Sequence, residues 1–206
     1  MAPLPSAEAS LGPSDAECLL DIANAAILDG LAGQPPAAPP LTALAPALRE
    51  RRGVFATLTV NGALNGCIGT VRGVEALGHG TARHAWSAAY ADPRLPRLRH
   101  ADYPRLTIEV SVLSLLAPIA ARSRRELLDQ LRPGADGLVI AADGHGGVFL
   151  PSVWEQLPDR SAFLDHLLVK AGLAPRYWPP EMRAWRFTAE KFVRRSNDQP
   201  LTSQIA

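Results

Sequence analysis

The residue best suited to chemistry in this sequence is a cysteine flanked by glycines. Cys67 stands in the stretch Gly66-Cys67-Ile68-Gly69. A thiolate is a strong nucleophile, and backbone N–H groups left unshielded by glycine can cradle a carboxylate, a phosphate or an oxyanion. The pattern favours a reactive thiol with a ligand-binding backbone at Gly66 and Gly69. The alternative is a cysteine that simply fits a tight strand.

Glu109 is the second candidate for chemistry. It lies among β-branched neighbours in Ile108-Glu109-Val110, where a carboxylate is costly unless it faces water or has a partner. Such a carboxylate can act as a general base or pair with an arginine. Arg94, in the loop Asp92-Pro93-Arg94, is the arginine we expect in that role.

Strand alternation brings these candidates together. Side chains two apart in a strand share a face, so Asn65 and Cys67 are expected to point the same way, and Glu109 to point away from Ile108 and Val110. If the two strands belong to one sheet, Asn65, Cys67 and Glu109 converge on one ligand. We expect Arg94 to neutralise the carboxylate there, because a second negative charge disfavours a thiolate.

Other functional classes find little support in the composition. The formal net charge is +1, which argues against nucleic-acid binding. The histidines show no metal-ligand spacing, so we expect no metal site. Apolar runs fall short of the roughly 18–20 residues that span a bilayer, and the first residues lack the features of a signal peptide. We therefore expect a cytoplasmic protein without membrane segments. Cys18 and Cys67 do not form a disulfide framework.

The elements that position these residues alternate between helices and hairpins. Asn61-Gly62 predicts a type I′ turn between two strands, and the five prolines of residues 34–46 predict an extended connector without regular structure. Two Ser-x-x-Glu capping boxes begin at Ser14 and Ser123. Helices are predicted at residues 14–33, 74–91, 123–131 and 160–172. Strands are predicted at residues 53–60, 63–71, 106–113, 137–142, 148–150 and 182–187, the last strand of the chain.

This order of elements predicts an α+β fold with a mainly antiparallel sheet and packed helices. Residues 1–13 are expected to form a disordered tail, residues 14–195 the folded domain, and residues 196–206 a polar C-terminal tail. The glycine-rich stretch 143–147 is expected to be a hairpin turn rather than a phosphate loop, because it lacks the lysine and the following helix.

The segment around Cys67 also resembles a known signature. Leu64-Asn65-Gly66-Cys67-Ile68-Gly69 is similar to the Leu-Arg-Gly-Cys-Ile-Gly motif of the AMMECR domain family, whose bacterial members are called AmmeMemoRadiSam system protein A. The resemblance covers roughly Ser14 to Phe192, and Asn65 stands where the family usually has arginine. Further matching stretches follow in the same order: Asp92-Pro93-Arg94, Ile108–Ser114, Gly137-Leu138, Phe149–Trp154 and Lys170–Leu173.

The resemblance implies two intimately associated subdomains, with the Gly-Cys-Ile-Gly segment near their junction. It also implies the company of a Memo-like protein and a radical S-adenosylmethionine protein, and it implies no settled activity or cofactor. Two hypotheses stay open. The protein is a small-molecule enzyme or enzyme subunit with a cleft around Cys67, or it is a non-catalytic partner that docks onto those components. The first hypothesis assigns Cys67 and Glu109 to catalysis and assigns substrate binding to Asn65, Gly66, Gly69 and Arg94.

Overall fold

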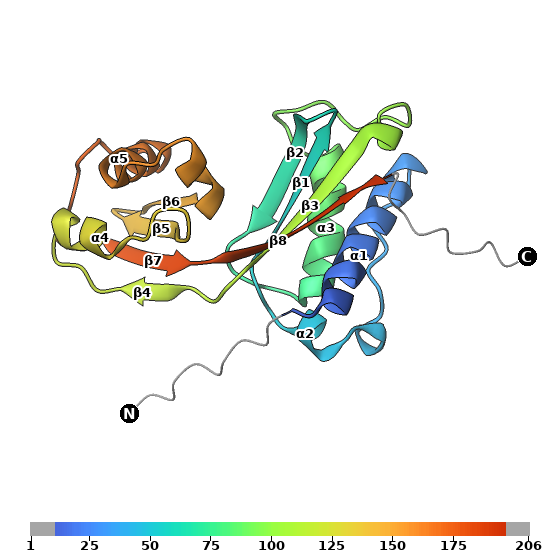
Figure 1. Cartoon of the computed structure of the whole chain (residues 1–206), viewed down its shortest axis with the longest axis horizontal. Helices are drawn as coiled ribbons and strands as arrows, with labels where there is room; N and C mark the ends of the chain where they lie inside the picture. The colour runs from blue at the N-terminus through green and yellow to red at the C-terminus, as the bar shows by residue number, and fades with distance from the viewer. Residues whose placement is uncertain (1–10, 197–206) are drawn as a thin grey trace, which may run out of the picture. The chain divides into compact units, whose positions relative to one another are not determined.

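The computed structural model of the protein describes residues 11–196, and the chain divides into two compact units (Figure 1). The first unit runs to Val112 and resumes at Glu190, and the second is Leu113–Ala189. The predicted tails fall largely outside the described residues. Leu11 and Ser196 are both buried, so the folded part begins and ends slightly beyond the predicted limits of 14 and 195.

A four-stranded sheet forms the frame of the first unit, with strand order β2-β1-β3-β8. Positive φ angles of 51° at Asn61 and 80° at Gly62 confirm the predicted hairpin turn. The strand pairs β1–β2 and β1–β3 are antiparallel. The strands are β1 (Val54–Val60), β2 (Ala63–Thr70), β3 (Leu106–Leu113) and β8 (Ala189–Arg195).

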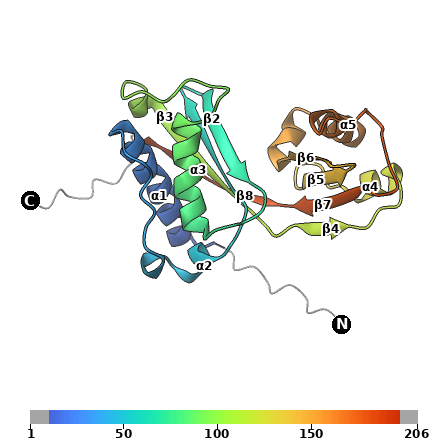
Figure 2. The same cartoon turned by 180° about the vertical axis from the view of Figure 1, so that it is seen from behind.

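Two helices, α1 (Pro13–Leu31) and α3 (Leu77–Tyr90), pack on one face of this sheet (Figures 1 and 2). They cover the apolar side chains of alternate strand positions, such as Ala56 and Leu58. The predicted capping box at Ser14 is wrong. The helix is capped at Gly12, whose N–H donates to the Asp15 carboxylate at 3.1 Å.

The proline-rich connector contains more structure than predicted. A 3₁₀ turn, η1 (Leu41–Ala43), and a short helix, α2 (Pro46–Arg49), occupy its end. Proline is tolerated at the first position of a helix because its missing N–H would have no partner there. A further 3₁₀ turn, η2 (Tyr103–Arg105), leads into β3.

The second unit has its own antiparallel sheet, with strand order β4-β7-β5-β6. Its core includes the ring of Trp154 stacked on Phe163, with 3.7 Å between ring centroids. As predicted, Ser123 caps α4 by accepting the Glu126 N–H. The elements are β4 (Ala117–Ile119), α4 (Arg124–Gln130), β5 (Gly137–Ala142), β6 (His145–Phe149), η3 (Pro151–Glu155), α5 (Arg160–Lys170) and β7 (Arg183–Phe187).

These units confirm the α+β class and the antiparallel sheets. The predicted hairpin turn is confirmed at Asp143 and Gly144, which have positive φ, but residues 145–147 of the glycine-rich stretch already belong to β6. The prediction that 182–187 is the last strand is wrong, because β8 follows it. Among residues 11–196, no helix has both the length and the apolar composition to cross a bilayer.

Candidate functional site

A row of polar side chains crosses the sheet of the first unit. Thr57 of β1 is the register partner of Cys67 on β2 and of Glu109 on β3. Directly paired residues point to the same side of a sheet, so all three lie on one face. That face is opposite α1 and α3, because the alternate residues Ala56 and Leu58 are in the core. Cys67 and Glu109 are therefore two strands apart, roughly 10 Å at the backbone.

The thiol of Cys67 interacts with the middle of the row. The Thr57 hydroxyl donates a hydrogen bond to Cys67 Sγ at 3.3 Å. The cysteine is free and half-buried, so the sulfur has a defined hydrogen-bonding partner and is still partly accessible. Both residues of this hydrogen bond belong to the first unit.

Glu109 completes the row with a different cation from the one predicted. Its Oε1 accepts a hydrogen bond from the Ser111 hydroxyl at 3.1 Å and lies 3.8 Å from Lys191 Nζ on β8. Arg94 makes no ion pair with Glu109, so the predicted neutralising role of Arg94 is wrong. Lys191 provides the nearby positive charge instead.

Arg94 binds Asp92, and together they clamp the backbone of Cys67. The Cys67 N–H donates to Asp92 Oδ2 at 3.0 Å, and Arg94 Nη2 donates to the Cys67 carbonyl at 2.9 Å. Arg94 also donates from Nε and Nη2 to the two Asp92 carboxylate oxygens, at 2.9 and 2.7 Å. The pair therefore satisfies both outward backbone groups of Cys67 on an edge strand.

The Asp92 carboxylate is strongly held in its charged form. Its side chain is only 2% exposed. The hydrogen bond from Arg94 is the largest cause that lowers the Asp92 pKa below its ordinary value, and the backbone N–H groups of Cys67 and Arg94 act in the same direction. These bonds outweigh burial, which alone raises the pKa of a carboxyl group.

The flanking glycines are explained by the protein's own packing. A Cβ on Gly66 would lie 1.8 Å from the carbonyl oxygen of Ala88 in α3, and a Cβ on Gly69 would lie 2.3 Å from the Phe55 ring. The predicted close approach is present, but helix α3 and Phe55 make it. The predicted ligand-binding role of Gly66 and Gly69 is therefore not the reason that these positions are glycine.

Asn65 does not join the row. The pairing of β1 with β2 shifts between Leu58 and Thr59, which leaves Asn65 as the extra residue of a bulge. Its Nδ2 donates to the Pro96 carbonyl at 3.3 Å. The predicted convergence of Asn65 with Cys67 and Glu109 is thus incorrect, because the bulge interrupts the alternation on which it relied.

A family comparison identifies the protein family to which these residues belong. A family model described as AMMECR1 matches residues 20–192. The chain belongs to the AMMECR1 family. The resemblance predicted from the segment around Cys67 is therefore confirmed, and the row and the clamp belong to an AMMECR1 fold.

Archaeal members of the AMMECR1 family are similar over much of their length. A protein from Methanothermobacter thermautotrophicus is 36% identical over 186 residues, which cover 89% of this chain and 96% of that protein. A protein from Thermococcus gammatolerans is 38% identical over 156 residues, 71% of this chain and 75% of that one. The crystal structure of an uncharacterized protein, PH0010 from Pyrococcus horikoshii, has 31% identity and a TM-score of 0.79. It matches over 89% of this chain and 93% of that chain.

Sequence reasoning missed three participants in this region of the AMMECR1 fold. Thr57 could not have been found from the Asn61-Gly62 turn alone, because the register of that turn places Ala56 opposite Cys67, and the bulge at Asn65 shifts the partner to Thr57. Asp92 was interpreted only as a helix stop before Pro93. Lys191 gave no usable signal, because its strand was not predicted.

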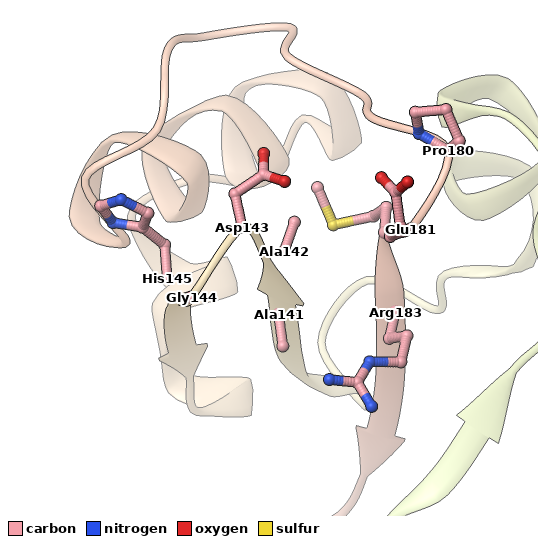
Figure 3. Close-up of a pocket in the computed structure, with 9 residues that line it drawn as sticks. Ala141, Ala142, Asp143, Gly144, His145, Pro180, Glu181 and Arg183 are labelled. Carbon is pink, nitrogen blue, oxygen red and sulfur yellow. The ribbon is translucent and has the colours of Figure 1, made fainter.

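Two cavities lie away from the row. One of about 540 Å³ is in the second unit, between the β5–β6 turn and the start of β7 (Figure 3). Figure 3 shows the carboxylates of Asp143 and Glu181 at its rim, and the Tyr177 hydroxyl donates to Asp143 at 2.7 Å. The other, of about 410 Å³, is at the turn end of the first unit's sheet. Neither cavity is lined by Cys67 or Glu109.

Three of the histidines, His79, His84 and His145, have structural partners or are buried. His79 contacts the Pro39 carbonyl, and His145 contacts the Ala171 carbonyl. Burial, aided by neighbouring Arg83, lowers the pKa of His84 to about 4, so its imidazole is neutral at pH 7. Within residues 11–196, no group of three or more His, Cys, Asp or Glu side chains is placed to hold a metal ion.

Proposed function

We propose that this AMMECR1-family protein acts on a small molecule, as an enzyme or as a subunit of one, through the row of Cys67, Thr57, Glu109 and Lys191. The observation that carries the proposal is the direct register of Cys67 and Glu109 with Thr57 on one face of one sheet. A thiol and a carboxylate aligned in this way can act on different atoms of the same ligand.

Each member of the row has a distinct chemical capacity. Cys67 provides the nucleophile, since thiolates react readily with electrophilic carbon. Glu109 provides a carboxylate that can accept a proton from the ligand, and Lys191 places a positive charge 3.8 Å from it. Thr57 holds the sulfur at 3.3 Å. A separation of roughly 10 Å between the strands of Cys67 and Glu109 suits a ligand several bonds long rather than a single small group.

The proposed setting is a complex with a Memo-like protein and a radical S-adenosylmethionine protein. Support for these partners comes from the family resemblance alone. Under this proposal the Cys67 row supplies one step of a joint reaction, and the partners supply the chemistry that a thiol and a carboxylate cannot.

Native purification tests the enzymatic proposal. The protein is isolated at its natural expression level, and mass spectrometry identifies bound small molecules and bound proteins. We expect a bound small molecule that is lost in Cys67→Ser and in Glu109→Gln but retained in the control Cys18→Ser. Melting temperatures establish that each variant is folded. Retention of the same molecule by both folded site variants would remove the support for the row.

A second candidate is a non-catalytic partner protein. It is favoured by the clamp of Asp92 and Arg94, which gives the Cys67 segment a structural role without any ligand. Under this alternative, Cys67→Ser leaves both the captured proteins and the function of the complex unchanged. The same purification therefore separates the two candidates, since only the enzymatic one makes the thiol indispensable.

A further inference from the structure

We propose a second binding site, for the phosphate group of a small molecule, at the turn end of the first unit's sheet. The cavity there has a volume of about 410 Å³, within the usual range of ligand pockets. It lies beside the β1–β2 turn, where the Asn61 N–H donates to the Arg105 carbonyl at 3.3 Å. It is lined by Asn61, Gly62, Pro104, Arg105, Leu106, Thr107 and Arg195.

The charges around this cavity are not balanced. Arg105 and Arg195 both line it. The carboxylate beside Arg105 is Asp102, which lies 3.0 Å from Arg105 Nη2 but also accepts hydrogen bonds from Arg99, at 2.7 and 3.2 Å. Arg195 has no acidic partner among residues 11–196. Arg99 and Arg105 therefore share one carboxylate and Arg195 has none, so these three guanidinium groups carry about two positive charges that an anion can offset.

Arg105 and Arg195 also have N–H groups that are available to bind a ligand. Arg105 uses Nη2 for the Asp102 carboxylate and the Ala101 carbonyl. Within the described chain, its Nε and Nη1 groups have no acceptor, and neither do the donors of Arg195. A guanidinium presents these N–H groups as a rigid planar fork that matches an oxyanion with two hydrogen bonds. The Thr107 hydroxyl is a further neutral donor on the cavity wall.

Phosphate fits this arrangement better than a carboxylate does. A phosphate monoester carries about 1.5 to 2 negative charges at pH 7 and presents three oxygens. It can therefore accept from two arginine forks at once and match the charge excess. A carboxylate offers one negative charge and two oxygens, which a single fork already occupies.

This site goes beyond the proposed function and does not depend on it. Thr107 precedes Glu109 by two residues in β3, on the same face and roughly 7 Å away along the strand. A ligand held by its phosphate at Arg105 and Arg195 can extend toward Glu109. The phosphate site stands even if the Cys67 row proves to be structural.

Calorimetric titration of the full chain with inorganic phosphate, at constant ionic strength and pH 7.5, tests the proposal. We expect saturable binding at one site per chain. Arg195→Gln and Arg105→Gln should each weaken it at least tenfold. Arg195→Lys keeps the charge but loses the fork, so it should weaken binding several-fold. The matched control is Arg125→Gln, which removes the same charge from a side chain that is 92% exposed in the other unit and should leave binding unchanged.

Several results would overturn the site. These are the absence of saturation in the wild-type chain, equal weakening by Arg125→Gln and Arg195→Gln, and equal affinity for acetate and phosphate. Arg195→Lys is the variant expected to stay folded, because it preserves the charge and the aliphatic stem of the side chain, so weaker binding in it cannot be attributed to misfolding. Wild-type affinity in a folded Arg195→Lys would show that charge alone attracts phosphate, and would also overturn the proposed fork.

Discussion

Asp92 and Arg94 give the Cys67 backbone the hydrogen-bonding partners that a neighbouring strand would otherwise supply. Strand β2 is at the edge of its sheet, and unpaired edge groups invite pairing with other chains. The carboxylate accepts the Cys67 N–H while Arg94 donates to the Cys67 carbonyl. Because the two side chains are also bound to each other, one ion pair protects the edge at this residue.

Asp92→Asn should lower the free energy of unfolding by about 2 kcal/mol at pH 7. Breaking a buried ion pair costs about 3–5 kcal/mol, but Arg94 is 63% exposed, and solvent screening reduces its share. Chemical denaturation measures the change. The control Asp129→Asn removes a carboxylate that is 72% exposed and 3.9 Å from its arginine, and it should change stability by less than about 0.5 kcal/mol.

The effect of Asp92 should depend on pH in a defined direction. The folded-state pKa of Asp92 is lowered from the ordinary 3.8. Its stabilisation is therefore complete above about pH 5 and is lost as the pH falls below about 4, where the unfolded chain takes up a proton first. Denaturation at pH 7 and pH 3 should show the difference between wild type and Asp92→Asn shrinking at the lower pH. A constant difference would contradict the assignment.

Cys67 should react with a thiol reagent several-fold faster than Cys18 near pH 7.5. Burial, followed by the charges of Asp21 and Asp15, raises the pKa of the Cys18 thiol, so little of it is thiolate at that pH. The variants Cys18→Ser and Cys67→Ser isolate the two rates. Equal rates in the two variants would remove the case for a distinctive thiol at Cys67.

At the scale of the element, the β2–α3 contact sets the limits on the Cys67 segment. Gly66→Ala should destabilise the protein by about 3 kcal/mol, because its Cβ cannot fit 1.8 Å from the Ala88 oxygen without moving the helix or the strand. Gly146→Ala is the matched control, since its Cβ would find only one backbone oxygen, at 3.4 Å. Thermal melts of both variants measure the contrast. Similar melting temperatures of the two variants would contradict this prediction and would show that α3 shifts at little cost in free energy.

The sequence predicted the elements whose apolar residues alternate cleanly. Thr57 and Glu109 were predicted on the strand face that points away from the core, because Leu58, Ile108 and Val110 clearly mark the core face. It also predicted that glycine at position 66 signals a close approach. It did not show that the approaching group is a helix of the same chain, because that depends on packing between distant segments.

Strand β8 escaped prediction for a related physical reason. Arg194 is 8% exposed and faces the helices, where it pairs with Glu17 and with Asp21. From the sequence alone, an arginine is expected at the surface unless acidic partners for it are known. The two partners of Arg194 lie more than 170 residues earlier in the chain. Strand β4 was missed because Pro118 argues against a strand, although proline is tolerated on an edge.

At the scale of the whole molecule, the second unit is an insertion within the first. The chain leaves the first sheet at the end of β3 and returns to it as β8. The ends of the insertion are close together, since the Ser114 N–H donates to the Thr188 carbonyl at 3.0 Å. The insertion therefore needs no long connection at its base.

Joining Leu113 to Ala189 through a short Gly-Ser linker should yield a folded first unit. Its core of α1, α3 and the four strands is complete without residues 114–188, and units with closely spaced ends tolerate excision. Circular dichroism and a cooperative thermal melt measure folding. The control deletes β8 as well and should abolish the transition. An unfolded shortened chain that retains β8 would mean that the second unit is needed for stability.

The inserted arrangement also has a consequence for synthesis on the ribosome. After β3 emerges, about 80 residues must be translated before β8 can join it, a delay of about 4 to 16 s at roughly 5–20 residues per second. During that interval β3 is an open sheet edge, and α1 lacks the arginine that pairs with Glu17 and Asp21. The second unit is contiguous and can fold first. A nascent chain should therefore acquire its later unit before its earlier one, and a stall in translation between residues 113 and 189 should expose the unfinished sheet to chaperones.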